Sequence, residues 1–347
     1  MDKTDRTDRR LAPVEPPADV PEIQRGNWLT LEPGDPVAEY AAEKLWDGPG
    51  QPVSWQAARL SQAAYIYRET STRWSVVAKF YSVKAGSEAD SYAERERDRI
   101  RQVQALGLGD GKARAVEPLG LWRGVLFLEY LPGLTLENII AVRHSQPGRL
   151  SHALGWVARF LVALHVRGLR PEAEGPDFAS SLDYARDVVH QLAKWGVLQD
   201  DPLARDGALR LIDSWARDAE METFAPTLTH GDATTTNAVF LGQEGIVVVD
   251  WERLYPGDPA SDLGRLMAEV THSINQHGGS VLEAQPFVET LCDAYSRALP
   301  ADWDGEGLVR RARFYRASST LRIARNGWVS RLDRTALVAQ AMALLAR

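Results

Sequence analysis

The segment from His230 to Asn237 gathers, in one short stretch, residue types that could carry out phosphoryl transfer. It reads His-Gly-Asp-Ala-Thr-Thr-Thr-Asn, and an apolar run, Ile-Val-Val-Val, ending in Asp250 follows shortly after it. Transfer from a nucleotide needs a carboxylate that orients the attacking hydroxyl and accepts its proton, and it needs hard oxygen ligands for Mg²⁺. We therefore assign Asp232 as the catalytic base, and Asn237 and Asp250 as the metal ligands.

Each of these residues also has a purely structural interpretation. Asp232 could bond to its own turn, Asn237 could cap a turn before a strand, and Asp250 could cap the turn after one. Their occurrence together favours the chemical interpretation. For His230 the preference is reversed, because Asp232 is better placed as a base, and we expect His230 to hold the loop by bonding to backbone. Glu252 could add a metal ligand, although nothing requires it.

Lys79 lies among apolar residues, in Trp74-Ser-Val-Val-Ala-Lys79-Phe-Tyr. A buried ammonium group is costly unless it meets an anion, and the α- and β-phosphates of a nucleotide would be such an anion. A glutamate from the charged segment that follows could hold the lysine by an ion pair, with Glu96 preferred and Glu94 the rival. The alternative is a solvent-exposed lysine beside a solvated helix face.

The elements that must position these residues fall into two regions. Residues 53–130 show mainly strand patterns, with strands predicted at 57–67, 74–81, 113–121 and 125–130 and a helix at 87–106. The last two strands form a hairpin about Trp122-Arg123-Gly124. Residues 134–347 are mostly helical, and their only predicted strands, 238–241 and 246–249, bracket the motif. Helices are predicted at 38–46, 149–166, 179–196, 202–220, 259–276, 280–298, 304–326 and 331–346.

These patterns divide the chain into three parts. Residues 1–25 carry charges and four prolines and are expected to be disordered. Residues 26–130 form a smaller domain that contains Lys79 and Glu96, and residues 131–347 form a larger domain that contains loop 230–237 and Asp250. The boundary is the interruption at Leu131-Pro132-Gly133.

Bulk composition excludes several classes of protein. The chain has 347 residues, 44% hydrophobic and 25% charged, with a net charge of −7, which argues against general attraction to nucleic acid or to a membrane surface. A single cysteine, Cys292, excludes an internal disulfide and fits a reducing compartment. No apolar run approaches membrane-spanning length, so we expect a cytoplasmic protein. No Gly-x-Ser-x-Gly motif supports a serine hydrolase.

Taken together, the residues resemble the aminoglycoside phosphotransferase and choline-kinase-like family. The matching segments, which span most of the chain, are Val77-Ala-Lys79, Glu94-Arg-Glu96, Leu128-Glu129-Tyr130-Leu131, Leu161 to His165 with Gly168, His230 to Asn237, Val248-Val-Asp250-Trp-Glu252 and Gly257-Asp258-Pro259 to Asp262-Leu263. The resemblance implies an α+β fold of the protein-kinase-like type. It would have two lobes: a small antiparallel-sheet N-lobe with one helix, and a larger, mainly helical C-lobe.

The resemblance also implies how substrates bind. The nucleotide would lie between the lobes, with its base held by hinge backbone near Glu129 and Leu131 and its phosphates near Lys79 and Glu96. Two departures stand out: the expected phosphate loop, Ser61 to Tyr65, has no glycine, and Asp250-Trp-Glu252 replaces the Asp-Phe-Gly of protein kinases. The loop without glycine predicts weaker binding of the nucleotide phosphates. The replacement of Asp-Phe-Gly argues against a protein substrate.

The predicted function is transfer of the γ-phosphate of ATP, with GTP possible, to a hydroxyl group of a small molecule. Mg²⁺ is the expected cofactor, and the acceptor stays open among amino sugars, antibiotics, sugars and amino alcohols. The alternatives are a nucleotide-binding pseudokinase acting as a scaffold or regulator and, third, a protein kinase. The arginines between 310 and 325 indicate salt-bridged surface or, alternatively, an acceptor that bears phosphate or carboxylate. The oligomeric state is not predicted.

Overall fold

The computed structural model describes residues 12–17, 22–23, 27–146, 148–172, 178–198, 202–242 and 245–346. Most of the tail predicted to be disordered, residues 1–25, lies outside these ranges. Within the described part of the tail, Val14 is buried, and its N–H donates to the carbonyl oxygen of Arg123 at 3.0 Å.

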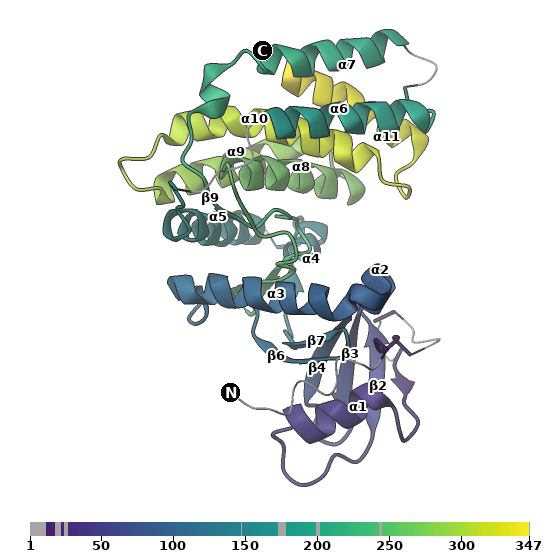
Figure 1. Cartoon of the computed structure of the whole chain (residues 1–347). Coiled ribbons are helices and arrows are strands. Elements are labelled where there is room, and N and C mark those ends of the chain that lie inside the picture. The colour runs from purple at the N-terminus through teal and green to yellow at the C-terminus, as the bar shows by residue number, and fades with distance from the viewer. Residues whose placement is uncertain are drawn as a thin grey trace. The chain divides into compact units, whose positions relative to one another are not determined.

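The chain forms two compact units. The first contains Met1–Asp110 and Ala115–Pro132, and the second contains Gly111–Arg114 and Gly133–Arg347. The expected α+β architecture is confirmed, with an antiparallel sheet in the N-terminal part and a mainly helical C-terminal part (Figure 1).

The first unit is built on a six-stranded antiparallel sheet. Its order is β1 (Leu29–Thr30), β2 (Trp55–Arg59), β3 (Ala64–Glu69), β4 (Ser75–Phe80), β7 (Val125–Glu129) and β6 (Pro118–Trp122). One face packs on α1 (Pro36–Tyr40) through an apolar core that includes Ala78, Phe80 and Phe127. Because strand side chains alternate, Lys79 points from the other face, where α3 (Ala89–Val103) packs against β6 and β7.

Two strand predictions for this unit are wrong in their extent. The segment 57–67 is not one strand, because it contains the last residues of β2, a turn and the first residues of β3. In the turn, Ser61 Oγ accepts from the N–H groups of Ala63 and Ala64. The segment 113–121 is broken before Pro118, which cannot donate to a ladder, so that β5 (Ala113–Ala115) and β6 are separate strands.

The hairpin turn at Arg123 and Gly124 is confirmed. Trp122 pairs with Val125, so the loop has two residues, and their φ angles are 46° and 76°. Two positive φ values define the turn type whose twist matches that of the flanking strands.

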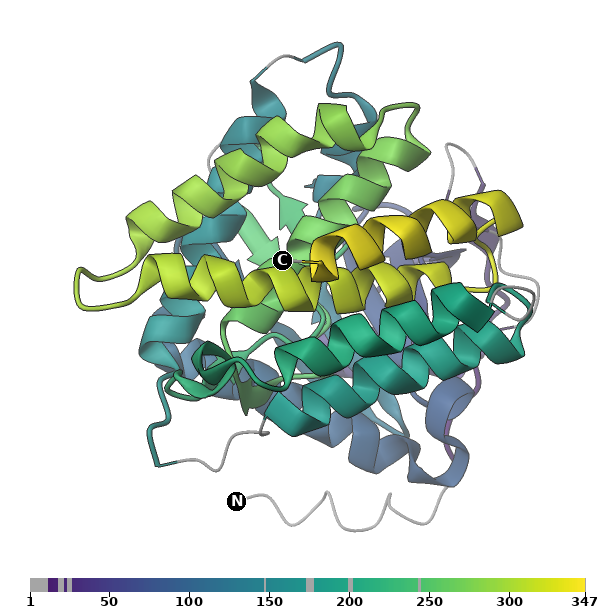
Figure 2. The same cartoon turned by 90° about the horizontal axis from the view of Figure 1, so that it is seen from above.

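The second unit is mainly helical. Its helices are α4 (Leu136–Ala141), α5 (Arg149–Arg167), α6 (Phe178–Lys194), α7 (Pro202–Trp215), α8 (Ala260–Gln276), α9 (Val281–Ala298), α10 (Gly305–Ala324) and α11 (Arg331–Leu345). Figure 2 shows α6 beside α7 and α10 beside α11, and α8 packs against α9 and α10. All helices predicted here from residue 149 onward are found, although α7 ends at Trp215 rather than at residue 220.

Short strands in this unit flank the motif. β10 (Ala238–Phe240) pairs with β11 (Ile246–Val248) in a sheet ordered β5-β11-β10-β8, where β8 is Leu134–Thr135. A separate two-stranded ribbon joins β9 (Thr227–Thr229) to β12 (Tyr255–Gly257). The sequence predicted β10 and β11 but not β8, β9 or β12, which are two or three residues long.

Among the helices that the structure describes, none combines the length and the apolar character that crossing a bilayer requires.

Candidate active site

The loop from His230 to Asn237 connects β9 to β10, and Asn237 fixes its geometry. The side-chain amide of Asn237 donates to the carbonyl oxygen of Asp232 at 2.9 Å, and its backbone carbonyl accepts from Val249 N–H at 3.0 Å. Val249 immediately precedes Asp250. Asn237 and Asp250 therefore lie at the same end of the β10–β11 hairpin, with the backbone of Asp232 bonded to that end.

Asp262, the third residue of α8, holds the beginning of the loop. Its carboxylate accepts from the N–H groups of His230 at 2.6 Å and Gly231 at 2.9 Å, and from the ring of His165 at 3.1 Å. Burial alone would raise the pKa of Asp262, but the bond and charge of His165 and the contacts with His230 hold it below the ordinary value. Asp262 is thus a structural anchor for the loop.

His230 also has the structural contacts that the sequence favoured. It is buried, its Nε2 bonds to the carbonyl of Val249 at 3.0 Å, and its Nδ1 accepts from the N–H of Asp232 at 3.2 Å. Its ring lies 4.5 Å from that of Trp251, which is fully buried. Because both ring nitrogens are engaged with backbone, His230 has no spare nitrogen for proton transfer.

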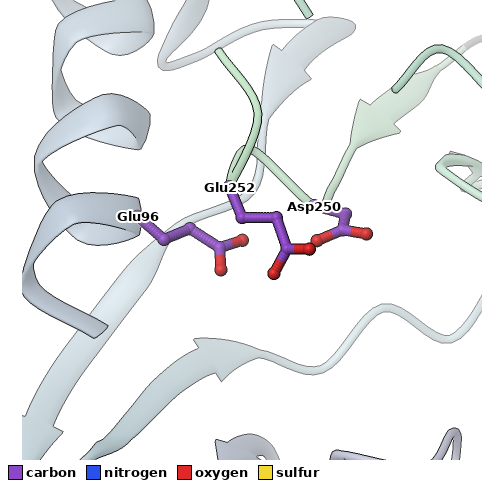
Figure 3. A group of neighbouring side chains, drawn as sticks. All are labelled: Glu96, Asp250 and Glu252. Atoms are coloured by element: carbon purple, nitrogen blue, oxygen red, sulfur yellow. The ribbon is translucent and has the colours of Figure 1, made fainter. Parts of the chain in front are cut away.

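Asp250 and Glu252 extend beyond the end of β11 (Figure 3). Asp250 has a φ of 66°, an uncommon conformation for a residue with a side chain, and such outliers cluster at functional sites. The two carboxylates offer oxygens within 4.8 Å of each other. With the amide oxygen of Asn237 at the same end of the hairpin, these are the hard oxygen donors that suit Mg²⁺.

The carboxylate of Asp232 contacts an arginine that the sequence reading missed. Arg265, one turn after Asp262 on α8, donates to Asp232 Oδ1, and Arg253 Nε lies 3.9 Å from Oδ2. The spacing from Asp262 could have revealed Arg265, because residues three apart on a helix share a face. The spacing alone did not single out Arg265, because it does not show which turn of α8 meets Asp232.

A pocket of about 260 Å³ lies beside Gly231 and Arg265. Hydroxyl-bearing side chains dominate its lining. They come from α6, α8, α10 and β12: Ser180, Ser181, Tyr184, Tyr255, Ser261, Tyr315, Ser318 and Ser319. Helix α6 contributes three of these side chains, Ser180, Ser181 and Tyr184, to the pocket.

The arginines of α10 and its C-terminal end are engaged within the second unit. Arg311 forms a buried ion pair with Asp258 at 3.0 Å, and Arg322 pairs with Glu269. Arg325 donates to the side chain of Gln191, and Arg316 to that of Thr271. The salt-bridged interpretation of this segment therefore agrees with the structure better than the ligand-binding one, but the expected surface position is wrong for Arg311, which is buried.

The remaining predicted residues lie in the first unit. Lys79 Nζ is 2.7 Å from Glu96 Oε2, and both side chains are almost completely buried, so the lysine pairs with the preferred glutamate. Glu96 projects from α3 (Figure 3). Glu129 ends β7, where its side chain accepts from the N–H of Glu117 at 2.8 Å, and Leu131 follows two residues later. Roles of these residues toward a nucleotide stay predictions.

Solved structures share this fold. The streptomycin-ATP-APH(2")-IIa ternary complex is 14% identical with a TM-score of 0.57, covering 89% of this chain and 97% of that chain. The choline kinase LicA from Streptococcus pneumoniae is 14% identical with a TM-score of 0.54, covering 88% and 97%. Plasmodium vivax ethanolamine kinase is 15% identical with a TM-score of 0.51, covering 82% and 78%. No curated protein matches the sequence.

The fold is thus that of the kinase-like phosphotransferases. A family model described as the phosphotransferase enzyme family matches residues 57–307, which is more than half of the chain. The protein belongs to this phosphotransferase enzyme family, and the expectation of a small-molecule kinase is confirmed at this level.

Proposed function

We propose that the protein transfers the γ-phosphoryl group of ATP, or of GTP, to a hydroxyl group of a small molecule. Asp232 is the base, and Asn237 and Asp250 hold Mg²⁺. This proposal rests mainly on two hydrogen bonds of Asn237 that hold the three residues together. The side chain of Asn237 bonds to the backbone of Asp232, and the backbone of Asn237 bonds to Val249, the residue before Asp250. Family membership supports the same chemistry.

In this mechanism the acceptor hydroxyl hydrogen-bonds to the carboxylate of Asp232. The carboxylate orients the oxygen and accepts its proton as the new oxygen–phosphorus bond forms and the bond to the β-phosphate oxygen breaks. Bound Mg²⁺ would neutralise charge on the β- and γ-phosphates. In the first unit, Lys79, held by Glu96, is the proposed partner of the α- and β-phosphates, and backbone at Glu129 and Leu131 the proposed partner of the base.

The relatives and the pocket indicate the size of the acceptor. Streptomycin, with ATP, is part of one similar structure, and two others are a choline kinase and an ethanolamine kinase. The pocket volume, about 260 Å³, lies just below the usual range of drug-sized sites. Its serine and tyrosine hydroxyls suit a compact polar molecule, such as a sugar, better than a large antibiotic.

The test is to incubate the purified protein with MgATP or MgGTP and a library of small hydroxyl compounds, and to detect phosphorylated products by mass. We expect a product with the natural protein and a loss of about 10²- to 10⁴-fold in rate with Asp232→Asn. Asp293→Asn is the matched control, since Asp293 is exposed on α9. If both proteins bind MgATP and neither phosphorylates any acceptor, the scaffold function replaces this proposal. Phosphate found only on polypeptides indicates a protein kinase.

A further inference from the structure

The pocket beside Gly231 and Arg265 has one cationic side chain among its lining residues, and that side chain contacts Asp232. Of the two charged residues in the lining, Asp262 is buried and bound to His165 and to two backbone N–H groups. Its charge is therefore already compensated. Arg265 is the other, and its side chain is 17% exposed. A ligand in this pocket accordingly meets the guanidinium group of Arg265 as the principal charge.

The guanidinium of Arg265 has donors to spare. It carries five N–H groups in a planar fork, and the contact with Asp232 uses only the Nη1 end of it. A planar fork matches the geometry of a carboxylate or a phosphate, both of which accept two parallel hydrogen bonds. The serine hydroxyls that surround the pocket can supply further donors to such a group.

The charges around Arg265 also favour an anion. Arg253 lies 3.9 Å from Asp232, and the Arg322–Glu269 pair interacts electrostatically with both Arg265 and Asp232. Counting Asp262 in the lining, three guanidinium groups stand against three carboxylates, but the charge of Asp262 is compensated by His165 and by two backbone N–H groups. Arg265 is the one cationic group among the lining residues, so an anionic group that enters the pocket is attracted to it.

We propose that the acceptor carries an anionic group, a carboxylate or a phosphate, and that Arg265 binds it while Asp232 binds the hydroxyl. This inference rests on the proposed function. Because Arg265 touches Asp232, the two groups of the acceptor are only a few bonds apart. In the protein without acceptor, Arg265 pairs with Asp232. The acceptor's anion then shares the guanidinium of Arg265, and the acceptor's hydroxyl shares the carboxylate of Asp232.

Matched small molecules test this specificity directly. Glycerol, glycerate and glycerol 3-phosphate present similar hydroxyl groups with no charge, a carboxylate or a phosphate, and 2-amino-1,3-propanediol presents a cation. Binding to the full-length protein is measured by calorimetry without nucleotide, and turnover is measured with MgATP. The variants are Arg265→Gln, Arg265→Lys and, as a charge-matched control, Arg297→Gln, which removes an exposed arginine on α9.

We expect at least one anion to bind at least tenfold more tightly than glycerol, and the two anions distinguish carboxylate from phosphate. Arg265→Gln should abolish this preference, Arg265→Lys should restore part of it, and Arg297→Gln should keep it. Where turnover occurs, Arg265→Gln should raise KM for the anion more than it lowers kcat.

Three results would overturn the inference. The first is that neither anion binds, and the second is that the neutral or cationic compound binds more tightly than the anions. The third is that the preference for the anion over glycerol persists in Arg265→Gln. Phosphorylation of a neutral or cationic acceptor alone would overturn this specificity while leaving the proposed function intact. Anion binding lost in Arg265→Gln, with no turnover of any acceptor, would support the site and count against the proposed function.

Discussion

The candidate loop requires glycine at position 231. Its φ is 75°, and a Cβ atom built on it would lie 2.1 Å from the carbonyl oxygen of Arg253. Its N–H also donates to Asp262. The tight approach of the two backbone segments is what brings Asp232, one residue later, beside Arg265 and Arg253.

Replacing Gly231 by alanine should therefore destabilise the protein more than backbone strain alone would. Gly278→Ala is the matched control, because its φ is 78° and nothing lies within 4 Å of the added Cβ. We expect Gly278→Ala to lower the free energy of unfolding by about 1–2 kcal/mol, the cost of a left-handed backbone. Gly231→Ala should lower it further, in denaturant unfolding curves, and should reduce phosphoryl transfer. Equal losses for the two variants would contradict this account of the loop.

At the level of residues, the sequence predicted the chemical types but not all of their neighbours. Asp232, Asn237 and Asp250 could be proposed from the sequence because their spacing along the chain is short and the residue types are specific. Arg265 lies on α8, 33 residues after Asp232 in the sequence. Its importance depends on tertiary packing, which determines which turn of α8 meets the loop, and no local pattern encodes that.

The β3–β4 turn illustrates how one side chain holds an element. The carboxylate of Glu69 accepts hydrogen bonds from the N–H groups of Ser71 at 2.9 Å, Thr72 at 2.7 Å and Val53 at 3.2 Å. It also accepts from the hydroxyl groups of Ser71 and Thr72. Burial by itself would raise the pKa of Glu69, but these bonds, led by that from Thr72, lower it from 4.5 to about 2.

This pKa sets a pH dependence for the stability of the sheet. Because the folded-state pKa is below the unfolded one, the stabilisation by Glu69 is fully present above pH 4.5 and is lost as the pH falls toward about 2. Glu69→Gln should thus unfold more easily than the natural protein at neutral pH, and the difference should shrink through that window. Thermal unfolding over a pH series measures it, with the exposed Glu306→Gln as control. A difference that stays constant with pH would contradict the prediction.

Long periodic elements were predictable, and short ones were not. Helices such as α7 and α8 repeat apolar residues at helical spacing over 14 and 17 residues, which gives a strong pattern. The six-residue α4 was not predicted. β8, β9 and β12 have two or three residues each. Such strands form because a partner segment lies beside them, so their existence depends on tertiary structure.

On the scale of the whole molecule, family and fold agree with the chemistry expected from the loop. The family match covers residues 57–307, and the similar solved structures cover most of both chains. The sequence predicted this family because the segment around Lys79, the loop from His230 to Asn237 and the strand before Asp250 all resemble segments of the family. It could not specify the acceptor, since the pocket is assembled from α6, α8 and α10, which are far apart in sequence.

The most direct test of the central claim uses ATP whose terminal phosphoryl group carries heavy oxygen isotopes. The natural protein, with Mg²⁺ and the acceptor library, is compared with Asp250→Asn and with the natural protein in excess chelator. We predict a small hydroxyl compound carrying the isotopically heavy phosphoryl group, with little or no product in either of the other two samples. Heavy phosphoryl found only in inorganic phosphate, or a product formed equally well after Asp250→Asn and in chelator, would contradict the account.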